Sequence, residues 1–105
     1  MRKENVTKVL NELGVHINVK GYSYLIEAVL IKNRNPHIST MEIYETIAQK
    51  HNSTIYAVER GIRHSTTNLQ NQAQKYFKLN YKLTNTMMIQ AIEEKARRVR
   101  VWKKY

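Results

Sequence analysis

The chain has 105 residues, which is enough for one domain with a single small core. It contains no Cys and no Asp, which excludes disulfide frameworks, thiol nucleophiles, cysteine zinc sites and aspartate phospho-acceptors. Eighteen Lys and Arg against eight Glu give a net charge of +10, and residues 60–105 hold eleven of these bases but only two acids. Such an asymmetric basic half predicts a polyanionic partner, most often a nucleic acid.

The first predicted helix covers residues 6–13, because its apolar residues follow helical spacing: Val6, Val9, Leu10 and Leu13. Gly14 follows where a glycine commonly ends a helix. A second apolar run predicts a helix over about residues 22–32, and the segment 33–36, which ends in proline, terminates it.

The segment Ser39-Thr40-Met41-Glu42 has the pattern of a capping box, in which Ser39 and Glu42 each satisfy a backbone amide of the other. Ile38 and Ile43 flank it as a hydrophobic staple. A third helix is therefore predicted from Thr40 to about residue 51.

The remaining elements are predicted from caps and apolar spacing. Ser53 or Thr54 caps a fourth helix that extends to about residue 72. Residues 74–83 alternate aromatic and basic side chains and fit a helix end, a loop or a short extended piece. Thr84 or Asn85 caps a last helix, and the basic residues from Arg97 onward form either a helix extension or a free arm.

These elements predict an all-α domain at residues 1–97, a compact bundle of about five to six helices that is winged-helix-like, with a basic tail at 98–105. Residues 40–51 and 55–70 form a predicted helix-turn-helix. Ala48 is small where the two helices approach, and Asn52 tolerates the left-handed backbone of a tight turn. The shared core is predicted at Ile47, Val58 and Ile62. An ordinary αα-hairpin with a solvated charged face gives the same pattern, and the basic charge of the same half favours DNA reading.

The outer face of the second helix carries the predicted contacts to DNA bases: Tyr56, Ala57, Glu59, Arg60, Arg63 and His64. Arginine can fork onto a guanine edge, and a glutamate can accept from a cytosine amino group. Predicted phosphate contacts are hydroxyl or basic side chains around this face and in the tail: Ser39, Thr40, Lys50, Thr67, Lys75, Lys78, Arg97, Arg98, Arg100, Lys103 and Lys104. The expected partner is double-stranded DNA, bound by a homodimer or by tandem copies.

Several short motifs occur in a fixed order along the chain. Residues 20–29 read KGYSYLIEAV, and residues 58–64 read VERGIRH. Leu13-Gly14-Val15, IAQK at 47–50, NST at 52–54 and KLTN at 82–85 accompany them. Together they resemble the C-terminal DNA-binding effector domain of the stage-zero sporulation master response regulator of spore-forming Firmicutes, whose motifs are K-G-Y-x-Y-L-x-E-A-I, I-A-K-K-F-N-T-T, V-E-R-A-I-R-H and K-P-T-N.

The resemblance implies a helical domain that binds promoter DNA, often as tandem or dimeric copies, with its reading helix at residues 58–64. Three departures limit what is carried over. The sequence has no receiver domain and no Asp, so activation by phosphorelay is not implied. Ala57 replaces a basic residue of the family, so the same DNA sequence need not be recognised. The segment between His64 and Thr84 is shorter than in the family and the tail is more basic, so the family's dimer contacts are not carried over.

Two other classes of function stay open. The chain could be an interaction or antagonist module that acts on a related sporulation regulator. It could also be a basic RNA-binding protein in which bases stack on Tyr76, Phe77 or Tyr81.

No sequence motif indicates an enzyme, and the four His residues are too widely spaced for a zinc site. We therefore expect no enzymatic activity, metal, cofactor or small-molecule ligand. The sequence has no signal peptide and no apolar run near the ~20 residues of a membrane helix. It is expected to be a cytoplasmic, nucleoid-associated protein of a bacterium that makes no contact with a membrane.

Overall fold

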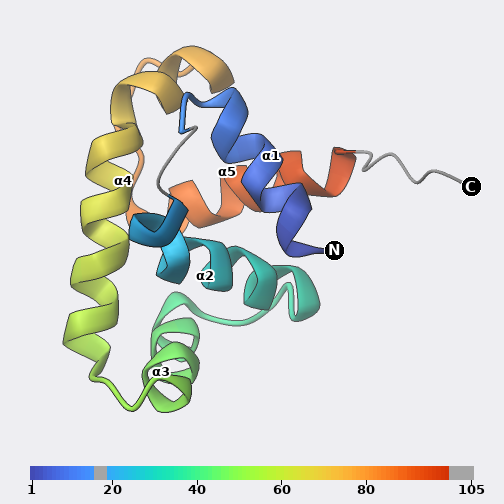
Figure 1. Ribbon diagram of the computed structural model, residues 1–105. Helices are drawn as coiled ribbons and strands as arrows, with labels where there is room; N and C mark the ends of the chain where they lie inside the picture. The colour runs from blue at the N-terminus through green and yellow to red at the C-terminus, as the bar shows by residue number, and fades with distance from the viewer. Residues whose placement is uncertain (16–18, 100–105) are drawn as a thin grey trace, which may run out of the picture.

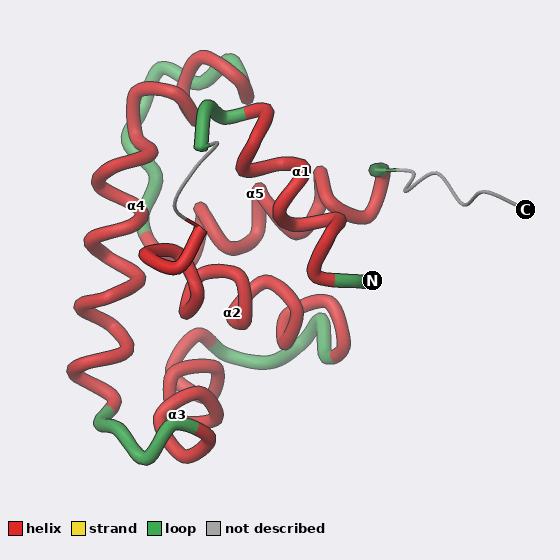
Figure 2. The backbone as a smooth tube through the Cα atoms, viewed as in Figure 1, coloured by secondary structure: helices red, strands yellow, loops and turns green. Residues whose placement is uncertain are grey.

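The structure, a computed structural model, describes residues 1–15 and 19–99. Five α-helices follow one another: α1 (Lys3–Glu12), α2 (Ser23–Arg34), α3 (Thr40–Lys50), α4 (Ile55–Phe77) and α5 (Asn85–Arg98), with a 3-10 turn, η1 (Val19–Tyr22), before α2 (Figure 1). These residues contain no strand (Figure 2). The all-α prediction is confirmed. Its winged detail is not, because a wing is a β-hairpin and the described residues supply none.

The local signals of the first helix act as predicted. The apolar stripe of α1 is buried at Val6, Val9 and Leu10. Gly14 follows with φ +100°, a left-handed conformation that glycine adopts without steric cost. Backbone bonds from Gly14 to Asn11 and from Val15 to Leu10 close the end of the helix.

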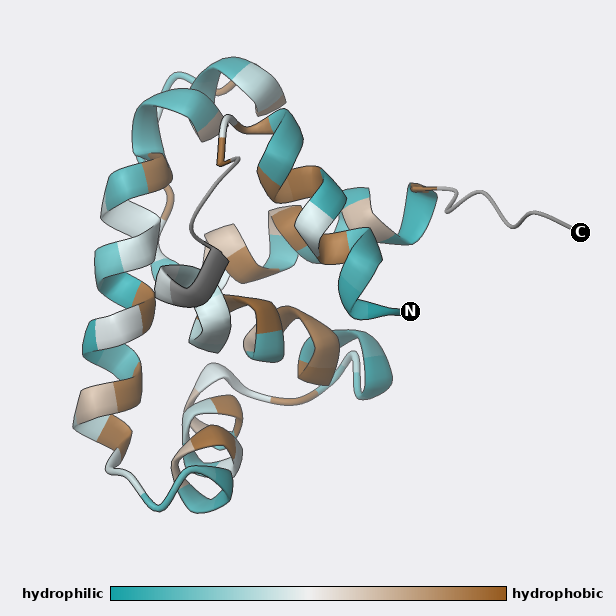
Figure 3. Ribbon diagram, viewed as in Figure 1, coloured by the Kyte–Doolittle hydropathy of each residue, from teal (hydrophilic) through white to brown (hydrophobic). Residues whose placement is uncertain are grey.

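The core lies between α5 and the helices that surround it. α5 buries Met88, Ile89, Ile92 and Ala96, and it packs against α1, α2 and α4. α2 adds four buried residues, Leu25, Ile26, Ala28 and Val29. Figure 3 shows that apolar positions of α4 face the other helices while its outer side is hydrophilic. α4 therefore runs along one side of the core and leaves a long polar face exposed.

The fourth helix is longer than predicted. It continues to Phe77, beyond the expected end near residue 72, because Ala73 is fully buried and extends the apolar stripe. It ends at Lys78, which adopts φ 57°, and the next amide, that of Leu79, donates to the Gln74 carbonyl at 2.8 Å. A lysine in this left-handed cap gives no sequence signal of the kind that glycine gives. Of the ambiguous segment 74–83, the first four residues are thus helical.

The last helix includes Arg97 and Arg98, the first two of the basic residues that the sequence left as either a helix extension or a free arm. Arg97 and Arg98 lie in the last turn of α5, where positive side chains stabilise a helix. Arg97 Nε is 2.7 Å from the Glu93 carboxylate one turn earlier. The Asn5 side chain donates to the carbonyls of Ala96 and Val99, so the start of α1 is joined to the end of α5. The predicted contacts Arg100, Lys103 and Lys104 lie outside the described residues.

None of the helices in the described part of the chain is both long and apolar enough to cross a membrane.

Candidate nucleic-acid interface

The connection between α3 and α4 is a tight turn held by backbone bonds. Asn52 has φ 50°, the left-handed conformation expected of it. The Ser53 amide donates to the Ala48 carbonyl at 2.8 Å. The Thr54 hydroxyl accepts from the Ala57 amide at 3.1 Å and so caps α4. Backbone and cap hydrogen bonds therefore hold the turn that joins the two helices.

The N-terminus of α3 is closed by the predicted capping box. Ser39 Oγ accepts from the Glu42 amide at 3.1 Å, and the Ser39 amide donates to the Glu42 carboxylate at 3.3 Å. The helix begins at Thr40, as the sequence predicts.

The shared core of the two helices is also confirmed. Ile47, Val58 and Ile62 are 0% exposed. Gly61 brings α4 close to α2, because a Cβ atom at this position would lie 2.9 Å from Cδ2 of the Tyr24 ring. A buried contact on one side of α4 leaves the opposite side free to meet a ligand.

The predicted base-reading residues gather on that opposite side. Tyr56 is 80% exposed. Ala57, Arg60, Arg63, His64 and Thr67 are exposed as well, and Glu59 is half-buried. They occupy the first thirteen residues of α4, and we call this surface, residues 56–67 on the outer side of α4, the reading face.

The two arginines of the reading face differ in their surroundings. Arg63 lies 3.3 Å from the Glu59 carboxylate, one helical turn away. Arg60 has no ion pair among the described residues. The Arg60 guanidinium therefore keeps all its donors available for a planar acceptor, whereas Arg63 shares its charge with Glu59.

Lys50, a predicted phosphate contact, is held by an acid from another helix. Its ammonium lies 2.6 Å from Glu27 of α2, and His51 lies 2.6 Å from the other oxygen of the same carboxylate. Burial raises the pKa of Glu27, but hydrogen bonds and charge from Lys50 and His51 outweigh it and leave the pKa lowered. A phosphate would have to compete with Glu27 for Lys50.

The lowered pKa of Glu27 predicts acid sensitivity of the link between α2 and the helix-turn-helix. Its folded pKa lies below the ordinary value of about 4.3, so its stabilising effect is complete above that pH and is lost as pH falls through the folded value. Urea unfolding from pH 7 to pH 3 gives the free energy of unfolding of the protein and of Glu27→Gln. The difference between the two values should narrow below about pH 4.5. A difference in unfolding free energy that does not depend on pH would show that the charge of the carboxylate contributes nothing to stability.

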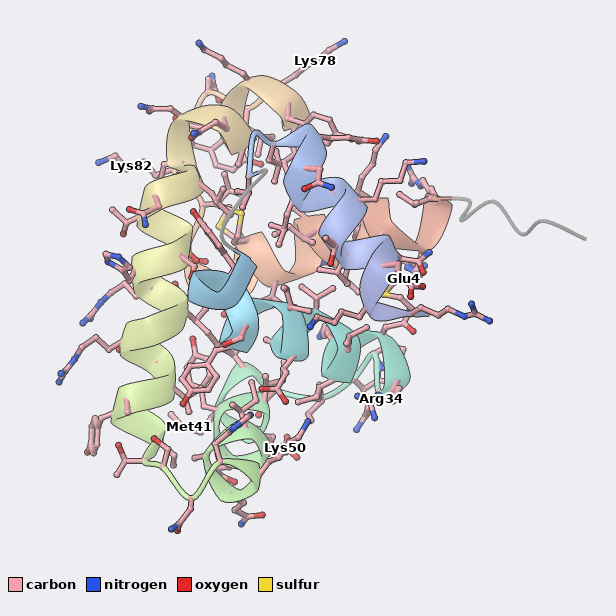
Figure 4. All side chains as sticks on the ribbon, in the orientation of Figure 1. Glu4, Arg34, Met41, Lys50, Lys78 and Lys82 are labelled. Carbon is pink, nitrogen blue, oxygen red and sulfur yellow. The ribbon has the colours of Figure 1, made fainter. Side chains whose placement is uncertain are left out.

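The other predicted phosphate contacts are spread over the molecule. Eighteen residues separate Arg60 from Lys78, about 27 Å along a helix at ~1.5 Å per residue. Figure 4 accordingly shows Lys78 at the opposite end of the structure from Met41 and Lys50. Lys75 lies in the last turn of α4, close to Lys78 in the chain, and Arg97 is paired with Glu93. The structure thus brings Thr67 to the reading face but not Lys75, Lys78 or Arg97.

One group of residues at this interface escaped the sequence analysis. Asn85, at the start of α5, donates from its side chain to the Tyr44 hydroxyl at 3.0 Å and to the Glu59 carbonyl at 3.5 Å. The hydroxyls of Thr40 and Thr86 are 2.8 Å apart. These bonds place the start of α5 beside both helices of the helix-turn-helix. The sequence marks residues 84–85 as a cap, but it contains no signal for their neighbours across the fold.

Within residues 1–15 and 19–99, no three His or Glu side chains are placed to share a metal ion.

Comparison with known proteins gives one family. No solved structure matches the chain. Residues 6–96 match the family described as sporulation initiation factor Spo0A C terminal, and this range includes α2 to α4 entirely and most of α1 and α5. The resemblance seen in the short motifs is therefore confirmed, and the chain belongs to the Spo0A C-terminal family of helical, DNA-binding sporulation transcription regulators.

Proposed function

We propose that the protein is a regulator that recognises a specific sequence of duplex DNA by placing the reading face of α4 in the major groove. The supporting observation is the exposed stripe of residues 56–67 on a helix whose opposite side is buried against α2 and α3. A major groove about 12 Å wide admits one α-helix. Membership of the family supports DNA binding and regulation, and the reading face adds the means of recognition.

In this proposal Arg60 reads a base, and Arg63, His64 and Glu59 complete the contacts along the groove. Arg60 suits a guanine because a free guanidinium can donate two parallel bonds to its O6 and N7 atoms. Ser39 and Thr40 lie at the N-terminus of α3, where the backbone amides that the capping box leaves free can donate to a phosphate, while the Glu42 carboxylate offsets part of the helix dipole. Thr67, exposed on the same side of α4 as Arg63, is placed for a phosphate at the edge of the groove.

The test is a fluorescence-anisotropy titration with three probes: a duplex selected from a genomic promoter pool, a random duplex of equal length and a matching single strand. We expect the selected duplex to bind at least ~10³-fold more tightly than the random one. The logarithm of affinity should fall linearly with the logarithm of salt concentration, with a slope that reports several neutralised phosphates. Equal binding of all duplexes at both of two salt concentrations would contradict sequence reading. The stoichiometry of the same titration tests homodimeric or tandem binding.

Single-stranded RNA is less well supported as the ligand, because the aromatic residues of the 75–82 stretch are packed. Tyr76 is half-buried, its hydroxyl donates to the Glu12 carboxylate, and Lys95 lies 5.4 Å from its ring centroid. Phe77 is half-buried and meets the Tyr76 ring edge to face at 5.0 Å. Only Tyr81 of the three is exposed, whereas a stacking platform needs several free rings. Tighter binding of the single strand than of either duplex in the titration would instead favour a single-stranded ligand.

An antagonist that acts on a related regulator remains the alternative from a different class. It predicts protein association at low micromolar concentration and no preference between the selected and random duplexes.

A further inference from the structure

A hollow of about 370 Å³ lies between α4 and the beginning of α5. Arg63, Thr66 and Thr67 line it from α4, and Thr84, Asn85 and Thr86 line it from α5. Arg63 and Thr67 also belong to the reading face, so the hollow opens beside the surface that the proposed function places on DNA. No residue of 84–86 is among the contacts predicted from the sequence.

The beginning of α5 is fixed from three directions. The Gln70 side chain exchanges two hydrogen bonds with the backbone of Leu83, just before the helix. The side-chain amide of Asn85 donates to the Tyr44 hydroxyl of α3, and the Thr86 hydroxyl pairs with that of Thr40. A binding group held in this way loses little conformational entropy when a ligand arrives.

This helix end has free donors, and α5 itself carries no acid in its first turn. Thr84 Oγ1 accepts the amide of Met87 at 3.2 Å, and the amides of Asn85 and Thr86 have no partner among the described residues. α5 has fourteen residues and no acidic side chain in its first turn. No side chain of its own first turn offsets the partial positive charge of this helix end, which favours an anion.

A second observation points to a ligand in the hollow. Thr66, which lines it, is 3% exposed, and its hydroxyl has no hydrogen-bond partner within residues 1–15 and 19–99. Buried polar groups almost always have a partner, so an unpaired hydroxyl needs an explanation. The hollow is where a ligand oxygen, or a water held by it, can supply that partner.

The chemistry of the lining selects a phosphate with limited charge. Arg63 contributes a guanidinium, but Glu59 also lines the hollow and lies 3.3 Å from it. The carboxylate limits the net attraction, so donors from backbone amides and hydroxyls must carry much of the recognition. A phosphodiester, with one negative charge and several acceptor oxygens, matches this set of groups.

We propose that this hollow binds a backbone phosphodiester of duplex DNA, next to the groove that α4 reads. The position of this site on the duplex rests on the proposed function. Binding of a phosphate at the site does not require that the protein prefer one DNA sequence. A phosphate held here sets the angle at which α4 enters the groove, because Arg63 and Thr67 contact both regions.

The first test compares Thr86→Glu with Thr86→Gln. Both remove the Thr86 hydroxyl, and only glutamate brings a negative charge to the site. We expect Thr86→Glu to weaken selected and random duplexes alike, by about tenfold relative to Thr86→Gln, as for loss of one hydrogen bond to a charged group. Its thermal stability should equal or exceed that of Thr86→Gln, since an acid is favourable in the first turn of a helix. Asn11→Glu, an exposed change of equal charge on α1, is the control and should alter affinity little.

The second test uses Thr66→Val, which removes the unpaired hydroxyl and keeps the shape of the side chain. Unfolding of the free protein should be unchanged or shifted to higher urea, because no bond is lost. Affinity for both duplexes should fall several-fold. Loss of stability with unchanged affinity would show that the hydroxyl serves the fold, and would overturn the proposal.

A third measurement identifies the source of the phosphate. Amide NMR signals of Asn85 and Thr86 should shift when duplex DNA is added and stay in place with inorganic phosphate at equal concentration. Shifts with inorganic phosphate alone would overturn the assignment to DNA. If the protein fails to prefer a selected duplex but Thr86→Glu still weakens random duplex, the proposed sequence reading fails and this site stands. If the protein prefers the selected duplex but Thr86→Glu and Thr86→Gln bind DNA equally, the phosphate site is contradicted and the proposed sequence reading stands.

Discussion

Substitution Arg60→Ala is expected to weaken binding to the selected duplex by 1–3 kcal/mol, which is about 5- to 150-fold. Binding to a random duplex should weaken much less, because a base contact carries the sequence information and a phosphate contact does not. Discrimination between bases should relax at one position of the site. Competition titrations with duplexes varied one base pair at a time would measure this directly.

The structure favours Arg60 over Arg63 for this role. Arg63 lies on Glu59, so its removal also frees a carboxylate at the DNA surface and mixes two effects. Arg60 is exposed and unpaired within the described residues. Its removal therefore leaves no unpaired protein charge behind, and the change in affinity measures the contact to DNA.

Two further variants separate the shape of the side chain from its charge. Arg60→Lys keeps the charge but cannot donate two parallel bonds, so it should keep random binding and lose specificity. Arg34→Ala removes one exposed charge at the end of α2, which Figure 4 shows pointing away from α4. It should affect selected and random duplexes slightly and equally. Equal losses on both duplexes for Arg60→Ala would show that Arg60 contacts a phosphate.

Local sequence signals were sufficient for the boundaries where one side chain controls the backbone. Ser39 and Glu42 determine the start of α3 through bonds between neighbours, and Gly14 marks the end of α1 because its left-handed backbone disfavours other residues. Asn52 and Thr54 locate the turn of the helix-turn-helix for the same kind of reason. Apolar spacing then identified the buried residues that join α3 to α4.

Contacts between distant segments could not be predicted in this way. Lys50 was predicted as a phosphate contact, but Glu27 of α2, 23 residues earlier in the chain, pairs with it. The start of α5 meets the helix-turn-helix through Asn85 and Tyr44, 41 residues apart. Neither pair has a spacing that periodicity can reveal. The left-handed lysine at the end of α4, Lys78, was missed for a different reason, since lysine has no preference for this conformation that would mark the position in the sequence.

The largest effect on stability is expected at Ile62, in the shared core of α3 and α4. The side chain is 0% exposed, so Ile62→Ala removes buried methyl groups and leaves a cavity, at a cost of about 2–5 kcal/mol. Ile62→Val should cost only about 0.5–1.5 kcal/mol. A domain of this size has a free energy of unfolding of about 5–15 kcal/mol, so the alanine variant should lie near its folding threshold. Urea unfolding at 25 °C measures both values.

Ile62→Ala and Arg60→Ala together test whether folding and recognition occupy opposite sides of the same helix. Arg60→Ala should change the free energy of unfolding by no more than about 0.5 kcal/mol, because its side chain is exposed and unpaired. Ile62→Ala, measured at a temperature where it stays folded, should retain the preference for the selected duplex, because its side chain does not reach the reading face. A decrease of less than about 1 kcal/mol in the free energy of unfolding of Ile62→Ala would contradict a tightly packed core. A loss of base discrimination in the folded Ile62→Ala variant would instead show that recognition depends on the angle at which the core holds α4.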